Sequence, residues 1–414
     1  MGTFLLQVKR KDITLLFILG GLMKILLITQ NFYPEIGSGA NRFKNLYLML
    51  SKHHEVNILT THPNYPNAKM YKNEKYWDEE YINASSDIFR LQMRVNKQAK
   101  SMFSRLLYYF ELAFKIRSFV KSYQNEYDAI YVTTPNIFIP WSSFFFQKKL
   151  QSTDRILEVR DLWPDSVKEV EKLNIKHIFP ILKYLEKRMY KKSDKIVINN
   201  EGFRSHIAGM VSGKEILYLP NAFNNSEVEF KSRMGEFKVI YTGNIGLAQS
   251  YEQIVEVADL LEKEKIKFTV VSYGMNAARF REHIHNNNFQ FIDVHSEKSR
   301  EECLEMIREH NIQLSLLKNS DVFLNVLPGK IIDGIGCGVP VVANLGGYAN
   351  KLINENEVGY SKAGASSYEI VQAIKRIKED IDLESSYRSN AKKVLYKEFL
   401  WENNIDKVLG FLNK

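Results

Sequence analysis

The chain has 414 residues, enough for two or three domains of ordinary size. Its composition, 45% hydrophobic and 12% aromatic with only 10 prolines, excludes a disordered or fibrous protein. Two cysteines, Cys303 and Cys337, exclude a disulfide framework and lack the paired spacing of a zinc site, which favours a reducing cytoplasmic setting. Of the net charge of +9, residues 1–220 carry +12 and residues 221–414 carry −3. We expect the basic half to face an anionic partner, nucleic acid or membrane, unless its charge is simply solvated.

The first 22 residues join Lys9-Arg10-Lys11 to an apolar run, as in a signal peptide, but no small-residue cleavage site follows. Lys24 interrupts the run before it reaches the roughly 20 residues of a spanning helix. We therefore expect translation to start at Met23. Residues 1–22 are then an untranslated extension or, less in keeping with the pattern, a weak membrane anchor.

From residue 23 onward, short apolar runs alternate with segments of helical period, the pattern of β/α units around a parallel sheet. Strands are expected at residues 25–29, 56–60, 129–133, 156–159, 196–199, 216–219, 237–242, 268–272, 290–294, 312–317 and 339–343. The pattern restarts near residue 236, after a polar segment that contains Pro220 and Gly235. This predicts a Rossmann-like domain over 23–220, a linker over 221–236, a second such domain over 237–390 and a crossing helix over 391–414.

Ligands of such sheets bind at the carboxyl ends of the strands, where this chain places glycines. Gly37 and Gly39 follow the first strand and lead into a helix, so backbone N–H groups can meet a phosphate there. A tight turn explains them equally well, and Arg42 stands where a GxGxxG sequence would have its third glycine. Gly243 ends the equivalent strand of the second half. Matching turns in both halves favour a ligand held by two domains.

The segment EVRDLWPDS at 158–166 places charged and aromatic side chains directly after a buried strand. Arg160 can neutralise a phosphate, Asp161 can accept a proton or a sugar hydroxyl, and Trp163 offers an apolar face to a sugar ring beside Asp165. The alternative is an internal ion pair between Arg160 and Asp161.

A second helix of interest begins at Pro328-Gly329 and carries Lys330 and Asp333 on one face of its first turn. A lysine at a helix N-terminus beside an aspartate suits a nucleotide diphosphate and the hydroxyls of its ribose.

Residues 100–123 form an apolar helical stripe flanked by lysines and arginines, and residues 138–150 repeat this combination of aromatic and basic side chains. Both segments are expected to touch an anionic membrane surface. The alternative is that both stripes pack on a sheet, as most amphipathic helices do.

Six segments recur in order in a known family: MKILLITQNFYPEIGSGANR, EVRDLWPDS, KSDKIVINNEGF, LPN, YTGNIGLAQ and PGKIIDGIGCGVPVV. Together they resemble the retaining glycosyltransferases of family 4, and within them the O-antigen and capsule enzymes that include N-acetyl-L-fucosamine transferases. The resemblance implies an α/β protein of GT-B fold, with two facing Rossmann-like domains and a cleft between them. It also implies acceptor binding by the first domain and sugar-nucleotide binding by the second.

Carried over by position, the resemblance places Gly37 and Gly39 near the donor phosphates. Asn244 and Gln249 stand where many relatives have Arg and Lys, so Lys330, the helix N-termini and Arg160 must supply the positive charge. Asn325 and Asp333 replace two glutamates of the broader family. Asp333 can still accept ribose hydroxyls, whereas Asn325 excludes a catalytic carboxylate at that point. The catalytic residues implied are Arg160, Asp161 and Lys330, with Trp163 and Asp165 against the acceptor or sugar.

The function expected from this resemblance is retaining transfer of an N-acetylated amino or deoxyamino sugar, from a UDP-sugar to a lipid-diphosphate-linked saccharide of a bacterial surface polysaccharide. The enzyme would act at the inner face of the cytoplasmic membrane without a metal or other cofactor, since no Asp-x-Asp motif ends a strand. Two alternatives remain: a sugar-nucleotide epimerase of the same fold, and a non-catalytic nucleotide-sugar-binding protein. Nucleic-acid binding is disfavoured because the sequence contains no recognisable nucleic-acid-binding module. A dehydrogenase is disfavoured because the sequence lacks the GxGxxG motif of dinucleotide-binding domains.

Overall fold

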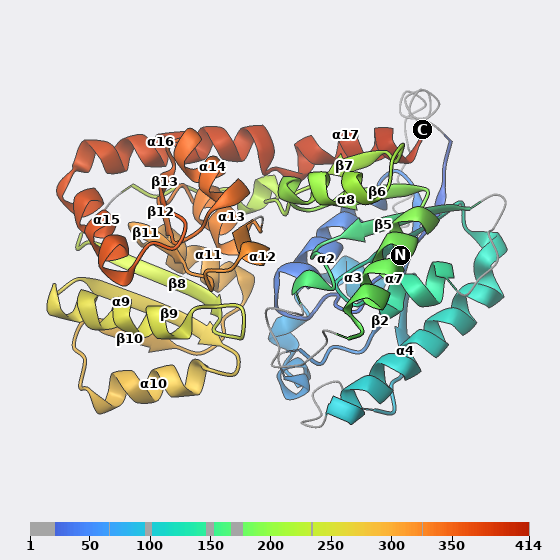
Figure 1. Cartoon of the computed structure of the whole chain (residues 1–414), viewed down its shortest axis with the longest axis horizontal. Coiled ribbons are helices and arrows are strands. Elements are labelled where there is room, and N and C mark those ends of the chain that lie inside the picture. Colours follow the sequence, from blue (N-terminus) through green and yellow to red (C-terminus); the bar gives the residue numbers. More distant parts are fainter. Residues whose placement is uncertain are drawn as a thin grey trace, which may run out of the picture.

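The chain folds into two lobes, each built on a parallel β-sheet covered by helices (Figure 1). The computed structural model describes residues 21–65, 67–95, 102–145, 153–166, 177–232, 235–324 and 326–413. Separate clusters of buried apolar side chains lie on the two faces of each sheet. The α/β class expected from the alternating pattern is confirmed.

The first lobe contains a seven-stranded sheet of order β3-β2-β1-β4-β5-β6-β7, with every pair of strands parallel. Its strands are β1 (Lys24–Ile28), β2 (Glu55–Thr61), β3 (Ile88–Leu91), β4 (Ala129–Thr133), β5 (Asp154–Val159), β6 (Lys195–Ile198) and β7 (Ile216–Tyr218). The strand order reverses between β1 and β4, whose register pairs Ile25 with Ala129. Such a reversal opens a crevice beyond the carboxyl ends of the two strands.

The second lobe repeats this plan in a six-stranded sheet of order β10-β9-β8-β11-β12-β13. Its strands are β8 (Lys238–Asn244), β9 (Lys267–Tyr273), β10 (Ile292–His295), β11 (Ile312–Ser315), β12 (Val341–Ala343) and β13 (Gly359–Ser361). Here the order reverses between β8 and β11, which pair Val239 with Ile312. Each lobe therefore has one reversal of strand order, the place where ligands of such sheets bind.

All eleven expected strands are present, with ends within two residues of those predicted. Strands β3 and β13 were not predicted from the sequence. Neither edge strand has a run of buried apolar residues: β3 is half-exposed along its length, and β13 has three residues beginning with Gly359. An edge strand has one neighbour and one open side, so its sequence needs little apolar patterning.

Helices fill the connections between the strands. In the first lobe they are α2 (Ser38–Leu50), α3 (Glu80–Ala84), α4 (Met102–Tyr123), α5 (Phe138–Pro140), α7 (Phe179–Lys192) and α8 (Arg204–Met210). In the second they are α9 (Tyr251–Lys263), α10 (Ala277–Asn286), α11 (Arg300–Arg308), α12 (Asp321–Leu324), α13 (Gly329–Gly336), α14 (Gly347–Glu355), α15 (Ser367–Glu379) and α16 (Ile381–Glu398).

The last helix, α17 (Trp401–Leu412), returns to the first lobe (Figure 1). Trp401 is fully buried there in the same apolar cluster as Phe43 of α2. The chain thus crosses between the lobes twice, and backbone hydrogen bonds join the crossings: Trp401 N–H donates to the Phe223 carbonyl at 2.9 Å. The segment 391–414 was expected to be one crossing helix; its described part, residues 391–413, comprises the end of α16 followed by α17.

Helix α4 runs along the outer edge of the first lobe (Figure 1) and presents two different faces. Tyr108, Leu112 and Ile116 are buried against the sheet, whereas Phe110 and Phe114 are 55% and 73% exposed. Part of the expected apolar stripe therefore faces outward. Among the described residues, no helix is long and apolar enough to cross a membrane.

Candidate functional site

A cleft of about 510 Å³ lies between the two lobes. Its walls are the loop after β1 with the start of α2, the end of β8, and the starts of α11 and α13. Seven residues singled out in the sequence line this cleft together: Gly37, Gly39, Arg160, Gly243, Asn244, Lys330 and Asp333. The glycine turns of the two lobes therefore meet across a shared cavity.

Two helices begin at the cleft, one from each lobe. A side-chain carbon placed on Gly329 at the start of α13 would lie 3.8 Å from Cβ of Ser38 at the start of α2, so the helix ends nearly touch. Neither α2 nor α13 has a side-chain cap among the described residues, and the first turn of each has no acidic residue. The first backbone N–H groups of both helices thus remain for a ligand, and both dipoles favour an anion between them.

Arg160 enters the cleft from the carboxyl end of β5 and lies against the start of α2. A side-chain carbon at Gly39 would meet its Nη2 at 2.6 Å, so only glycine leaves room for the guanidinium. The guanidinium lies 5.7 Å from the Phe43 ring, and burial lowers its pKa below the ordinary arginine value. No described carboxylate forms an ion pair with it, so the expected alternative pair with Asp161 is absent from the described structure.

Lys330 faces Arg160 from the opposite lobe, on the first turn of α13. Its Nζ lies 4.8 Å from the Tyr241 ring, and a side-chain carbon at Gly243 would come within 3.2 Å of it. Burial lowers its pKa to about 8, although the nearby Asp333 charge acts in the opposite direction. Its ammonium makes no ion pair with any described carboxylate, which leaves a second cation available to an anionic ligand.

Arg42 lies one turn after Gly39 on α2, and its environment differs from those of Arg160 and Lys330. It is fully buried, and its Nε donates to Glu158 Oε1 at 2.6 Å, while Tyr131 donates its hydroxyl to Oε2 of the same carboxylate. Its two Nη atoms donate to the carbonyls of Pro220 and Leu219, each at 2.8 Å. This arginine thus joins α2, β5 and the crossing between the lobes, and its hydrogen-bonding groups are satisfied within the protein.

Asp333 lies one turn after Lys330 and is held by a residue that the sequence analysis missed. Arg300, the first residue of α11, donates from Nη1 to Asp333 Oδ1 at 3.1 Å and from Nε to Glu227 Oε1 at 2.5 Å. Burial raises the pKa of Asp333, and the Arg300 charge counteracts that rise. The signal that could have found Arg300 is the sequence SREE, a capping box of Ser299 and Glu302 that marks a helix start beyond a strand.

Asn244 and Gln249, at positions where relatives have Arg and Lys, shape the turn after β8. The Asn244 side chain lies between Gly246 and Gly274, and a side-chain carbon on Gly274 would fall 1.9 Å from its Oδ1. Gln249 Oε1 accepts from the Gly246 N–H at 2.9 Å and does not line the cleft. Neither residue replaces the cations of the broader family. Asn325 lies outside the described residues.

The second part of EVRDLWPDS turns away from the cleft. Asp161 accepts hydrogen bonds from Ser166 and the Leu162 N–H, and burial raises its pKa. The Trp163 ring packs edge-on against Trp141, with 5.8 Å between ring centroids. Arg160 is therefore the one residue of that motif that lines the cleft in the described structure, because the loop beyond it folds back onto its own lobe.

Asp165 likewise packs within the first lobe, in a charged cluster with Glu186 and His206. Their ligand atoms lie within 4.8 Å of one another, a spacing that could suit a metal ion. Lys183 Nζ, however, donates to both Asp165 and Glu186 at 2.7 Å. Its ammonium already supplies the positive charge that a metal would bring, so the residues do not fit a metal site.

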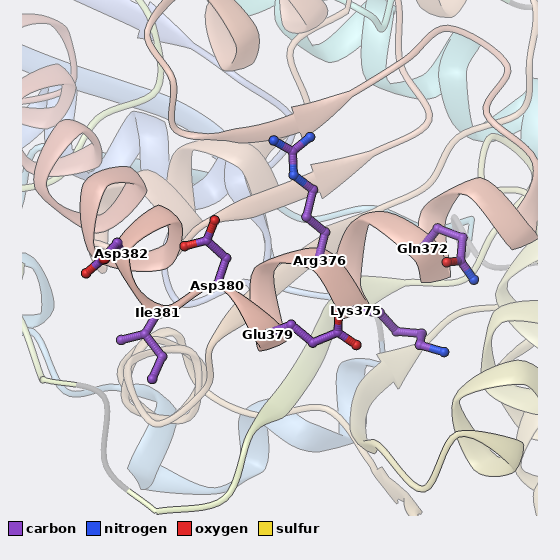
Figure 2. Close-up of a pocket in the computed structure, with 7 residues that line it drawn as sticks. All are labelled: Gln372, Lys375, Arg376, Glu379, Asp380, Ile381 and Asp382. Atoms are coloured by element: carbon purple, nitrogen blue, oxygen red, sulfur yellow. The ribbon is translucent and has the colours of Figure 1, made fainter.

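A larger hollow of about 770 Å³ lies on the outer surface of the second lobe, where α15 meets α16 (Figure 2). Its lining residues include both acidic and basic side chains, and these form ion pairs and helix caps with the surrounding helices. Lys375 pairs with Glu264 at 2.7 Å, and Asp380 caps α16 by accepting from the Leu383 N–H at 2.8 Å. These contacts make it part of the helix framework, so the candidate site is the cleft.

Two pairs of tyrosines also join the lobes, and the first of them lines the cleft. Neither pair could be predicted from the sequence. Tyr65, from the loop after β2, meets Tyr273 at the end of β9 edge-on, with ring centroids 6.2 Å apart. The hydroxyls of Tyr218 and Tyr348 are 3.0 Å apart. Contacts between residues so distant in the chain have no local pattern.

Comparison with solved structures defines the class of fold. A sucrose-phosphate synthase from Thermosynechococcus elongatus superimposes with a TM-score of 0.72 at 14% identity, over 94% of this chain and 98% of that one. The Anabaena protein Alr3699/HepE, solved in complex with UDP-glucose, gives a TM-score of 0.65 at 14% identity, over 94% and 98% of the two chains. The fold is therefore GT-B, as the resemblance implied.

Sequence comparison narrows the class. Residues 223–394, which include Lys330 and Asp333, match the family described as Glycosyl transferases group 1. The chain is also 22% identical over 343 residues to WcaI of Escherichia coli (strain K12), named for colanic acid biosynthesis glycosyl transfer, covering 76% of this chain and 82% of that protein. These matches support a GT-B glycosyltransferase.

Proposed function

We propose that the protein is a retaining glycosyltransferase that moves a sugar from a UDP-sugar to a lipid-diphosphate-linked saccharide. The observation that carries this proposal is the convergence of two uncapped helix starts with Arg160 and Lys330, two cations without described ion-pair partners. A nucleoside diphosphate supplies the negative charge that such a site lacks. The UDP-glucose complex of Alr3699/HepE supports a sugar nucleotide as the donor.

The chemistry derived from this arrangement is stabilisation of the leaving group. As the bond between the sugar and the β-phosphate breaks, negative charge grows on the departing diphosphate. Lys330, Arg160 and the first N–H groups of α2 and α13 would stabilise that charge in place, without reorganisation. Of the described carboxylates that line the cleft, Glu35 accepts hydrogen bonds from the Asn64 and Tyr65 N–H groups and Asp333 accepts one from Arg300, while Asp78 and Glu297 complete the set. We propose attack by the acceptor on the same face as the leaving group, without a carboxylate nucleophile.

The acceptor side is assigned to the first lobe and to a membrane surface. Helix α4 presents exposed Phe110 and Phe114 next to basic residues such as Arg105, Lys115 and Arg117. Ile181 and Tyr184 of α7 are also exposed, at 60% and 58%. Apolar side chains among cations suit the headgroup layer of an anionic bilayer, which supports an acceptor carried by a lipid. We place the protein at the inner face of the cytoplasmic membrane on this basis. In the described part of the segment 138–150, which was also expected at the membrane, the Trp141 side chain is partly buried.

For the donor sugar and pathway, the resemblance to O-antigen and capsule enzymes and the similarity to WcaI support surface polysaccharide synthesis. We propose an N-acetylated amino or deoxyamino sugar, and a reaction that needs no metal, because the cleft supplies its own cations.

The direct test is UDP release from a panel of UDP-sugars, with and without a lipid extract that contains diphosphate-linked saccharides. The proposal predicts release that requires one donor and the extract together, with the α-anomeric donor giving an α-linked product. Conversion of the donor without any acceptor would identify an epimerase instead. Binding of UDP-sugars without turnover would identify a binding protein.

Membrane contact is tested separately by sedimentation with vesicles of phosphatidylglycerol and phosphatidylcholine. Replacing Phe110 and Phe114 by serine should reduce the bound fraction several-fold, while the free energy of unfolding changes by less than about 0.5 kcal/mol per site, since both side chains are exposed. The matched control replaces Tyr368 and Ile381, equally exposed on the second lobe, and should leave binding unchanged. Equal losses in both variants would contradict the assignment of α4.

A further inference from the structure

The Arg300 side chain connects the cleft to the segment that joins the lobes. Its Nη1 donates to Asp333 on α13. Its Nε donates at 2.5 Å to Glu227 on the connector, which is the segment between β7 and β8. The guanidinium also lies 5.0 Å from the ring of Phe223, the residue where the two crossings pair. Arg300 and Asp333 both line the cleft. Three contacts thus fix the guanidinium, and through it one oxygen of Asp333.

This contact affects what Asp333 can bind. Its Oδ1 accepts from Arg300 at 3.1 Å, and no described residue donates to its Oδ2. Burial alone would favour the neutral acid, while the adjacent guanidinium favours the carboxylate, which is a pure acceptor. The result is a carboxyl group with one oxygen held in place and the other available to a hydroxyl group.

We propose that Arg300 is a positioning residue that holds the Asp333 carboxyl group in place and aimed at the ribose hydroxyls of a bound ribonucleoside diphosphate. The proposal rests on the proposed function only in that the cleft binds such a nucleotide. Arg300 acts through Asp333, and it selects ribose over deoxyribose because a fixed acceptor left without its hydroxyl loses a hydrogen bond in a desolvated site.

The same helix supplies a matched control. Arg308, two turns after Arg300 on α11, donates to the carbonyls of Glu227 and Glu229 at 2.6 and 3.2 Å and pairs with Glu305 at 3.3 Å. It therefore holds the same connector but does not line the cleft. A variant at Arg308 disturbs the connector to a similar degree without touching Asp333.

The experiment measures binding of UDP and 2′,3′-dideoxy-UDP by calorimetry to the wild type and to the R300M, R300K, D333N and R308M variants of the full chain. The wild type should bind UDP at least about 10-fold more tightly than the dideoxy analogue. R300M and D333N should weaken UDP about 10-fold and leave the dideoxy analogue unchanged, so that the preference disappears. R300K keeps the positive charge but not the planar guanidinium with its several N–H donors, so it should retain part of the preference for UDP over the dideoxy analogue. R308M should retain all of that preference.

The double variant R300M/D333N separates positioning from a general structural role. If Arg300 acts through Asp333, the double variant should bind UDP no more weakly than D333N alone. Equal weakening of UDP and the dideoxy analogue in R300M, or loss of the preference in R308M, would overturn the proposal. Binding of ADP and GDP, each compared with its own 2′,3′-dideoxy analogue, is measured alongside. Ribonucleotide binding without sugar transfer would defeat the proposed function and still test Arg300, and a wild type that binds none of these nucleotides would overturn both.

Discussion

Arg42, Arg160 and Lys330 line the same cleft, and the partners of Arg42 differ from those of the other two cations. Arg42 is buried against Glu158, with further hydrogen bonds to the crossing between the lobes. Arg160 and Lys330, at the cleft, form no ion pair with a described carboxylate. We therefore expect Arg42 to stabilise the protein, and we propose that Arg160 and Lys330 keep their charge for a ligand. Position at the cleft does not separate these cations, whereas the absence of a described ion pair does, and it is the criterion on which the proposed roles of Arg160 and Lys330 rest.

The largest expected effect is a loss of stability when Arg42 is replaced. Replacing Arg42 by methionine leaves the Glu158 carboxylate buried without its cation, which should lower the free energy of unfolding by about 3–5 kcal/mol. Chemical denaturation measures this. The double variant R42M/E158Q should recover part of the loss. A loss below about 1 kcal/mol would show that the pair is not structural.

The next effect concerns Lys330. Replacing it by alanine should lower kcat/KM on the order of 100-fold, because the departing diphosphate loses a cation, while stability changes little since no ion pair is broken. The control is K298A, which also removes a cleft lysine, but one paired with Glu302 at 3.7 Å. An unchanged rate in K330A would remove Lys330 from the site.

A smaller effect is expected at a residue with no functional group. The added carbon of G39A would lie 2.6 Å from Arg160 Nη2, so the guanidinium must move. We expect activity to fall about 10-fold through this displacement, with stability nearly unchanged because the far end of a flexible side chain can shift. G209A, where the added carbon meets nothing within 4 Å, is the control. Full activity in G39A would show that the position of Arg160 is unimportant.

The smallest effect is a pH dependence. Since burial lowers the Lys330 pKa to about 8, its ammonium form is lost as the pH rises through that value. The kcat/KM for the donor should therefore decline above about pH 8, by severalfold within one pH unit. In K330R, whose guanidinium stays charged, the decline should shift well upward. The same decline in both proteins would assign it to another group.

Much of this fold could be predicted from the sequence. The buried strands were found because apolar runs such as 129–133 alternate with helical segments, and an edge strand such as β3 was missed because half of it faces solvent. Within the candidate site, glycines and cations next to strand ends predicted that Gly39, Arg160 and Lys330 lie together, and all three line the cleft.

The sequence could not reveal which neighbours would neutralise each other. Trp163 and Asp165 were expected beside the sugar, but the loop that carries them packs on Trp141 and Lys183 of its own lobe. Arg300 was missed because its partners Glu227 and Asp333 are 73 and 33 residues away. Such long-range pairing depends on the assembled tertiary structure, which local spacing does not encode.

The central claim is that Arg160 and Lys330 hold the diphosphate of a nucleotide. The most direct measurement compares the affinities of UDP and UMP for the wild type and for the R160M/K330M double variant. We predict that the wild type binds UDP about 100-fold more tightly than UMP, because the added phosphate reaches both cations, and that the double variant loses most of this difference. An unchanged difference between UDP and UMP in the double variant would contradict the account.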